Sequence, residues 1–116
     1  MFIKSTVITP FRKLSFVYHT PSNFFNTSHF LNQYPEKSLN RWIDNNDTEK
    51  VLNRAACVLC IRKNNLFKVH LFNDKDDGLY IHPILTNYFL KWTSIDEAHK
   101  YVLPKYLEVI NKNNGF

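Results

Sequence analysis

The sequence predicts an α+β fold, in which a helix-turn-helix-like cluster is combined with a β-hairpin wing and additional N-terminal strands. Alternating β-branched and aromatic residues open the chain, apolar residues at helical spacing follow, and a polar loop ending in glycine separates two apolar runs. Of the 116 residues, 44% are hydrophobic and 16% are aromatic. That is enough apolar surface for one core, so we expect residues 1–116 to form a single domain.

Two strands are expected at the N-terminus, over residues 2–9 and 14–20. Both runs are rich in β-branched and aromatic side chains, and Pro10 lies between them. In the second run, Leu14, Phe16 and Tyr18 share one face because side chains alternate along a strand. Residues 21–23 are expected to form a turn.

Three short helices are expected next, joined by polar residues. The first covers residues 28–33, can be capped by Asn26 or Thr27, and ends at Pro35, which disfavours helix at the residue before it. The second can be capped by Ser38 and carries an apolar stripe of Leu39, Trp42 and Ile43.

The third helix should begin at residues 46–49, which have the spacing of a capping box. Its expected apolar face consists of Val51, Leu52, Ala55, Val58 and Leu59. Three short helices with tight polar joints resemble a helix-turn-helix in outline.

A β-hairpin is expected after the helices. Residues 66–72 should form a strand, residues 73–78 a polar loop ending in glycine, and residues 79–81 the returning strand. Pro83 suits the first position of a helix, and we expect His82 to tie strand to helix through a hydrogen bond to nearby backbone.

The helix after Pro83 carries a wide apolar stripe that ends at Trp92. Residues 94–97 have the spacing of a capping box for the last helix, which Pro104 should kink or split. Residues 111–116 are expected to fray.

The basic residues are concentrated in the middle of the chain. The formal net charge is +5 and the isoelectric point about 9.3. Residues 37–75 hold eight Lys or Arg against four acids, a net charge of +4, whereas residues 76–116 have a net charge of −1. A small basic domain often binds a polyanion, although a solvated basic surface accounts for the charge equally well.

Candidate DNA-binding residues follow from this distribution, because cations neutralise phosphates and Asn or Arg side chains can bind base edges. The acids Asp44, Asp47 and Glu49 lie among them and would repel phosphate if they shared a face. The candidates are Lys37, Asn40 and Arg41 in the second helix, Lys50, Asn53 and Arg54 in the third, and Arg62, Lys63, Lys68 and Lys75 around the hairpin.

Catalytic and metal-binding motifs are missing from the sequence, so we expect neither an enzyme nor a bound metal or cofactor. Cys57 and Cys60 are expected to pack in the core. A zinc site would need two more ligands, and the spacing to His70 and His82 matches no common finger. A redox pair is disfavoured because the cysteines fall at the end of a helix rather than at its start.

Nothing in the sequence approaches the ~20 apolar residues of a membrane span. The N-terminus also lacks the apolar core of a signal peptide. We therefore expect a soluble, intracellular protein. The sequence predicts no particular oligomeric state.

Residues 14–107 resemble the KilA-N domain of large DNA viruses and phages, which is related in fold to fungal APSES domains. The resemblance rests on the segment 25–27 (FNT), Trp42, the segment 78–83 (GLYIHP) and Trp92. It implies double-stranded DNA binding through a helix-turn-helix and a basic wing, by a viral or phage regulatory protein in the host cytoplasm or nucleus. The alternative is a protein-interaction or decoy module that keeps the fold but makes no DNA contact.

The sequence departs from the usual family pattern near the end of the domain. Leu79 replaces the usual threonine after the glycine, residues 94–98 differ from the usual cap, and Pro104 interrupts a helix that normally continues.

Overall fold

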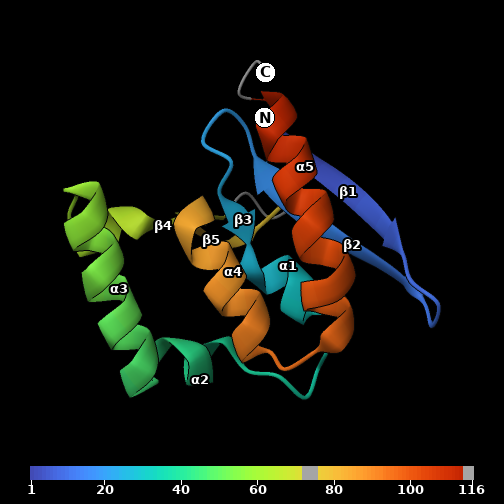
Figure 1. The fold of residues 1–116 in the computed structure, drawn as a ribbon, viewed down its shortest axis with the longest axis horizontal. Helices are drawn as coiled ribbons and strands as arrows, with labels where there is room; N and C mark the ends of the chain where they lie inside the picture. The colour runs from blue at the N-terminus through green and yellow to red at the C-terminus, as the bar shows by residue number, and fades with distance from the viewer. Residues whose placement is uncertain (72–75, 114–116) are drawn as a thin grey trace.

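The fold is built on a five-stranded antiparallel sheet, and helices pack in front of this sheet (Figure 1). The computed structural model describes residues 1–71 and 76–113. The strand order is β1-β2-β3-β5-β4. The strands are β1 (Phe2–Ile8), β2 (Lys13–His19), β3 (Phe25–Asn26), β4 (Phe67–His70) and β5 (Gly78–Ile81).

The N-terminal strand pair is confirmed. β1 and β2 pair along their full lengths, from Phe2 opposite His19 to Ile8 opposite Lys13. Thr9 closes the turn between them, because its Oγ1 accepts hydrogen bonds from the backbone N–H groups of Phe11 and Arg12 at 3.2 and 3.0 Å. This hairpin extends to the right in Figure 1.

β3 is a strand that the sequence pattern did not predict. It consists of two residues and lies between β2 and β5, with Phe25 opposite both Tyr18 and Ile81. Two residues are too few to show alternation, yet β3 connects the N-terminal strand pair to the β4–β5 hairpin. The fold therefore has one continuous sheet instead of two separate hairpins.

Apart from the 3₁₀ turn η1, which the sequence pattern did not predict, the helical segments lie where the sequence predicts helix, with shifted ends. They are α1 (Thr27–Leu31), α2 (Leu39–Ile43), α3 (Asn46–Leu59), a 3₁₀ turn η1 (Lys63–Leu66), α4 (Pro83–Trp92), a π-helical turn η2 (Ala98–Val102) and α5 (Leu103–Asn113). The helix expected over residues 28–33 ends at Leu31, and the strand expected over residues 66–72 spans only Phe67–His70.

Three predicted caps can be compared with the structure. Asn26 caps α1 as expected, since its Oδ1 accepts from the His29 N–H at 2.9 Å. The cap of α3 is Asn45 rather than Asn46, because the Asp47 N–H donates to Asn45 Oδ1 at 2.8 Å. Ser94 has a left-handed φ of 56°, and the Ile95 N–H instead donates to Thr93 Oγ1 at 3.4 Å.

Pro104 causes a local change of helix type. It is the second residue of α5, directly after the π-helical turn η2. Proline has no N–H to donate to the preceding turn, and its ring clashes with the carbonyl of residue i−4 in a regular α-helix. The π-helical turn over Ala98–Val102 departs from regular α-helix just ahead of Pro104, and this departure accommodates the proline ring.

The core is aromatic. Phe89 on α4 has no exposed surface, and its ring centroid lies 5.1 Å from that of Trp42 on α2 and 6.2 Å from that of Phe25 on β3. Tyr106 on α5 contacts the ring of Phe25 at 5.3 Å, and its hydroxyl donates to the backbone carbonyl of Asn23. These contacts hold α2, α4 and α5 on the sheet.

The expectation that Cys57 and Cys60 are buried is wrong, because both are exposed. Val58, expected on the apolar face of the same helix, is 66% exposed. The buried residues of α3 are Thr48, Leu52 and Ala55, none of them in its last turn. The end of α3 lies at the left edge of the molecule (Figure 1), where these side chains are exposed.

Among the described residues, no helix combines the length and apolar character that crossing a bilayer requires.

Candidate nucleic-acid interface

The outer face of α3 carries three of the predicted binding residues. Successive residues are about 100° apart around a helix axis, so the buried stripe of Thr48, Leu52 and Ala55 defines an opposite side. Lys50 and Asn53 lie on that opposite side, and Arg54 lies close to it. All three are exposed. These three side chains therefore face away from the buried Leu52 and Ala55.

Both ends of α3 are well defined. Asn45 caps the first turn, and Asp47 and Glu49 stand near the N-terminus, where acidic groups interact favourably with the helix dipole. Cys60 ends the helix in a left-handed conformation with φ 56° and ψ 41°. Between these ends lie 14 helical residues, a length of about 21 Å.

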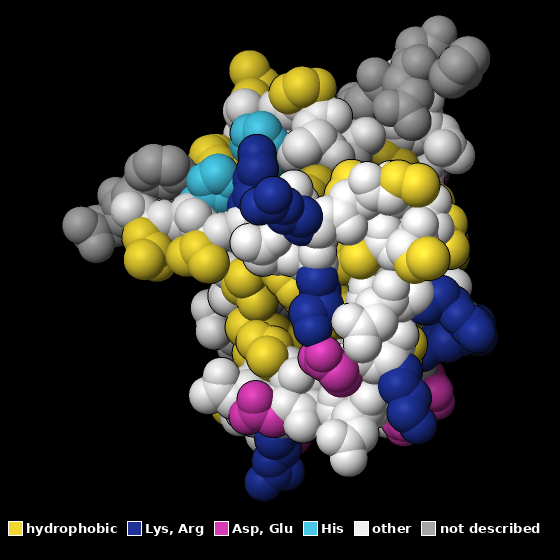
Figure 2. Space-filling view, turned by 90° about the vertical axis from the view of Figure 1, so that its left-hand side faces the viewer, with side chains coloured by type: hydrophobic (Ala, Val, Ile, Leu, Met, Phe, Trp, Pro, Cys, Tyr) yellow, Lys and Arg dark blue, Asp and Glu magenta, His cyan; other side chains and the backbone are white. Residues whose placement is uncertain are grey.

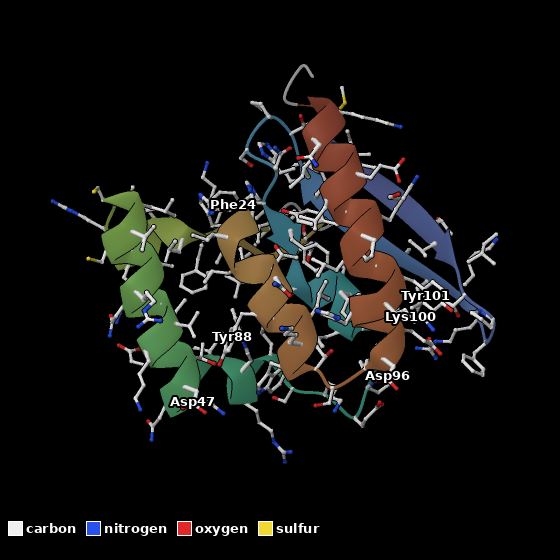
Figure 3. The ribbon with its side chains drawn as sticks, viewed as in Figure 1. Phe24, Asp47, Tyr88, Asp96, Lys100 and Tyr101 are labelled. Atoms are coloured by element: carbon white, nitrogen blue, oxygen red, sulfur yellow. The ribbon has the colours of Figure 1, made fainter. Side chains whose placement is uncertain are left out.

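The two acids of α3 lie at different angles around the helix: Asp47 lies on the same side as Arg54, and Glu49 lies about 100° from Lys50. Asp47 lies at the N-terminal end of α3 (Figure 3). Glu49 is paired with Lys63 of η1, with Oε1 and Nζ 2.5 Å apart. Asp47 therefore shares the outer face at its N-terminal end, about two turns before Arg54, whereas Glu49 lies outside that face.

Basic residues continue from α3 to the edge of the sheet. Arg62, Lys63 and Lys68 are exposed and follow one another through η1 into β4. Lys63 is the partner of Glu49, so it is less available for phosphate. Lys68 Nζ lies 6.0 Å from the centroid of the Phe24 ring. Lys75 lies outside the described residues.

The three candidate residues around α2 differ in exposure and position. Lys37 is half-buried in the connection between α1 and α2, where it borders a shallow hollow with Leu31 and Leu39. Asn40 and Arg41 are exposed on α2 itself. Figure 1 shows the α1–α2 connection beneath α4, away from the outer face of α3. The structure therefore does not group Lys37 with Lys50 and Arg54.

A space-filling view of the α3 side shows the whole surface (Figure 2). Lys and Arg side chains follow one another down this face from a pair of His side chains, and the Asp and Glu side chains lie in its lower half. None of the ion pairs between described residues involves Arg41, Lys50, Arg54, Arg62 or Lys68. These cations are available for a polyanion.

The β4–β5 hairpin is held in place by the segment 26–28. Asn26 Nδ2 donates to the backbone carbonyl of Asp77 at 3.2 Å, and Thr27 Oγ1 donates to that of Leu79 at 2.8 Å. The Leu79 N–H in turn donates to Ser28 Oγ at 3.0 Å. The sequence identified Asn26 and Thr27 as caps, but their contacts with the hairpin depend on the β3–β5 pairing and were missed.

His82 joins β5 to α4, as expected. Its Nδ1 accepts a hydrogen bond from the Ile84 N–H at 3.1 Å, which makes it the cap of α4. Partial burial lowers the pKa of His82 because burial penalises the charged form. No group of three or more His, Cys, Asp or Glu residues that could hold a metal occurs within 1–71 and 76–113.

The model of one family, described as the KilA-N domain, matches residues 10–113. No curated protein and no solved structure matches the chain.

Proposed function

Because the chain belongs to the KilA-N family, which is generally a DNA-binding domain family, we propose that it binds double-stranded DNA through the outer face of α3. Arg62 and Lys68, which continue the basic surface into η1 and β4, contact the DNA backbone beside that face. The observation that carries the proposal is the placement of Lys50, Asn53 and Arg54 on one exposed face, with Asp47 only at its N-terminal end and Glu49 outside it.

The dimensions and chemistry of α3 suit the major groove of DNA. That groove is about 12 Å wide and admits an α-helix. Arginine pairs well with guanine and asparagine with adenine, so Arg54 and Asn53 are the residues we assign to base contact. Lys50 is assigned to phosphate, because an ammonium group acts as a point charge without bidentate geometry.

In this proposal α2 and α3 act as the helix-turn-helix, and the β4–β5 hairpin acts as the wing. Only Asp44 and Asn45 separate the two helices, as in a tight helix-turn-helix joint. Lys68 and Lys75 would hold the DNA backbone from the hairpin, and Arg41 would approach it from α2. We assign the protein to a viral or phage regulatory role inside the host cell, where its DNA target would be.

Binding to random-sequence duplex DNA over a salt series tests the proposal. We expect the log of affinity to fall linearly with the log of salt concentration, with a slope of about −0.9 per neutralised phosphate. The variant Lys50→Gln/Arg54→Gln should bind at least about tenfold more weakly, because one arginine–base contact contributes roughly 1–3 kcal/mol.

The matched control is Lys100→Gln/Lys112→Gln, which removes the same charge from η2 and α5. Figure 3 shows Lys100 on the side of the molecule away from α3. The control should bind DNA nearly as tightly as the wild type. Equal losses in the two variants, or binding that does not depend on salt, would contradict the proposed interface.

A specific observation also favours the alternative of a protein-binding module. Val58, Val69 and Leu71 are 66%, 63% and 74% exposed, and large exposed apolar side chains are typical of sites that contact a protein partner. In this case the outer face of α3 would have no role, and the Lys50→Gln/Arg54→Gln variant would behave like the wild type with DNA.

A further inference from the structure

Two histidines from distant parts of the chain lie together on the sheet. His19 ends β2 and His70 ends β4, and their rings are stacked with centroids 5.6 Å apart at an interplanar angle of 21°. Phe2 contacts both rings at 5.0 Å, and Tyr80 contacts His70 at 5.0 Å. We call these four residues the histidine cluster.

Positive charge surrounds this cluster. Partial burial lowers the pKa of His19, and the positive charges of the Met1 amino group, His70 and Lys68 lower it further. Among the described residues, the acids of this hairpin are Asp76 and Asp77, which precede Gly78, the residue paired with His70.

His19 is held in place by its neighbours. Its Nδ1 is 2.7 Å from Ser22 Oγ, and the stacked ring of His70 supports one face. No hydrogen bond within the described part of the chain involves His19 Nε2. Lys68 lies opposite Tyr80 in the β4–β5 pairing, and the Tyr80 ring contacts His70, so the Lys68 ammonium group lies beside the histidine cluster.

We infer that His19 and Lys68 form a phosphate-binding site, which extends the DNA contact from α3 across η1 onto the face of the sheet. The inference rests on the proposed function, since the phosphate is that of the DNA backbone. Figure 2 shows two His side chains beside Lys and Arg side chains on the α3 side of the molecule.

This site makes DNA binding depend on pH. In the free protein, burial and the neighbouring cations keep His19 neutral near pH 7. A phosphate supplies the opposite charge and favours the protonated ring, which can then donate a charge-assisted hydrogen bond from Nε2. Complex formation therefore takes up a proton, and affinity must rise as pH falls.

The test is the affinity for random-sequence duplex DNA between about pH 5.5 and pH 8 at constant ionic strength. We expect wild-type affinity to rise about threefold to tenfold over this range as pH falls, since one linked proton changes affinity by at most tenfold per pH unit. His19→Gln should abolish most of this rise. Lys68→Gln should weaken binding at every pH.

His99→Gln is the matched control. His99 lies on η2, where its Nε2 is 3.3 Å from Asn87 Oδ1, and its removal should leave the pH dependence unchanged. If His19→Gln does not fold, proton NMR of the wild type supplies the measurement instead. The resonances of His19 should then titrate at higher pH when duplex DNA is added.

The outcomes separate this inference from the function on which it rests. Salt-dependent binding that is lost in Lys50→Gln/Arg54→Gln, but has the same pH dependence in His19→Gln as in the wild type, overturns the phosphate site alone. A His19 titration that does not change when DNA is added would also overturn the phosphate site alone. Absence of DNA binding at every pH overturns both.

Discussion

Asn26 and Gly78 show how single residues connect two distant segments of this chain. The Asn26 side chain caps α1 through its oxygen and holds the start of the hairpin through its nitrogen. Gly78 has a φ of +149°, and a Cβ atom built there would lie 2.4 Å from Asn26 Oδ1 and 2.8 Å from Ser28 Cβ. The segments 25–27 and 78–83, which carry the family resemblance, therefore meet in space.

Gly78→Ala should destabilise the protein by about 2 kcal/mol or more, because both the backbone conformation and the space at this position exclude a side chain. Thermal and urea unfolding measure the loss. Asn64→Ala, an exposed change in η1, is the control and should change the free energy of unfolding by less than about 0.5 kcal/mol. An equally stable Gly78→Ala variant would contradict the close packing of Asn26 on the hairpin.

His82 should make stability depend on pH. Burial lowers its folded-state pKa below the unfolded value of 6.5, as it also does for His19 and His29. The unfolded chain then binds more protons below about pH 6.5. The free energy of unfolding should be greatest above that pH, decrease as pH falls from about 6.5 toward the lower folded-state pKa values, and level off below them.

Two variants isolate the cap made by His82. His82→Ala should cost about 1 kcal/mol at pH 7.5, whereas His82→Asn should keep most of the stability because asparagine is also a good helix cap. His82→Asn should also lose less stability than the wild type between pH 7.5 and pH 5.5. Equal stability of the alanine and asparagine variants would show that the Ile84 N–H bond contributes nothing.

At the residue scale, contacts between residues close in the sequence were easier to predict than the burial of individual side chains. The bond from the Ile84 N–H to His82 lies within the motif itself, so Pro83 after a strand was enough to anticipate it. The exposure of Cys57 and Cys60 depends on which elements cover the end of α3. That information is in the tertiary arrangement and not in helical periodicity.

Among the elements, α3 carries the proposed interface. The position at which α3 begins depends on its N-cap. We expect Asn45→Ala to destabilise the protein by about 1 kcal/mol, since Asn45 Oδ1 accepts the hydrogen bond from the Asp47 N–H. Asn46→Ala, one residue later, should have little effect, because position 46 is already inside the helix. Chemical denaturation compares the two variants, and a larger loss in Asn46→Ala would contradict this boundary.

Element types were predictable from the sequence, while their ends and one strand were not. The partial 2-residue alternation and β-branched and aromatic composition of β2, and the apolar stripe of α4, were sufficient for both elements. β3 is too short for any periodicity, and it exists because β2 and β5 flank it. The π-helical turn before Pro104 likewise reflects how the chain accommodates a proline within packed helices.

At the scale of the whole molecule, the aromatic core and the charged surface have separate roles. Trp42, Phe89 and Tyr106 connect helices to the sheet and have no exposed surface. The Lys and Arg residues lie outside this core, and those of α3, η1 and β4 follow one another on one side (Figure 2). The rigid core can therefore hold α3 in a fixed orientation while its outer face contacts a partner.

The site was predictable in part. The net charge of residues 37–75 indicated the correct region, and helical spacing placed Lys50, Asn53 and Arg54 on one face. The separation of Lys37 from them depends on the path between α1 and α2. The pairing of Glu49 with Lys63 depends on how η1 folds against α3. Neither could be derived from spacing along the chain.

The central claim is that the outer face of α3 contacts DNA, and mapping the contact surface by NMR tests it most directly. A ¹⁵N-labelled sample titrated with random-sequence duplex DNA should show its largest amide shift changes in α3, at Lys50, Asn53 and Arg54, and smaller changes at Arg62 and Lys68. The amides of α5 should change little. Changes confined to α5 or the β1–β2 hairpin, with α3 unaffected, would contradict the account.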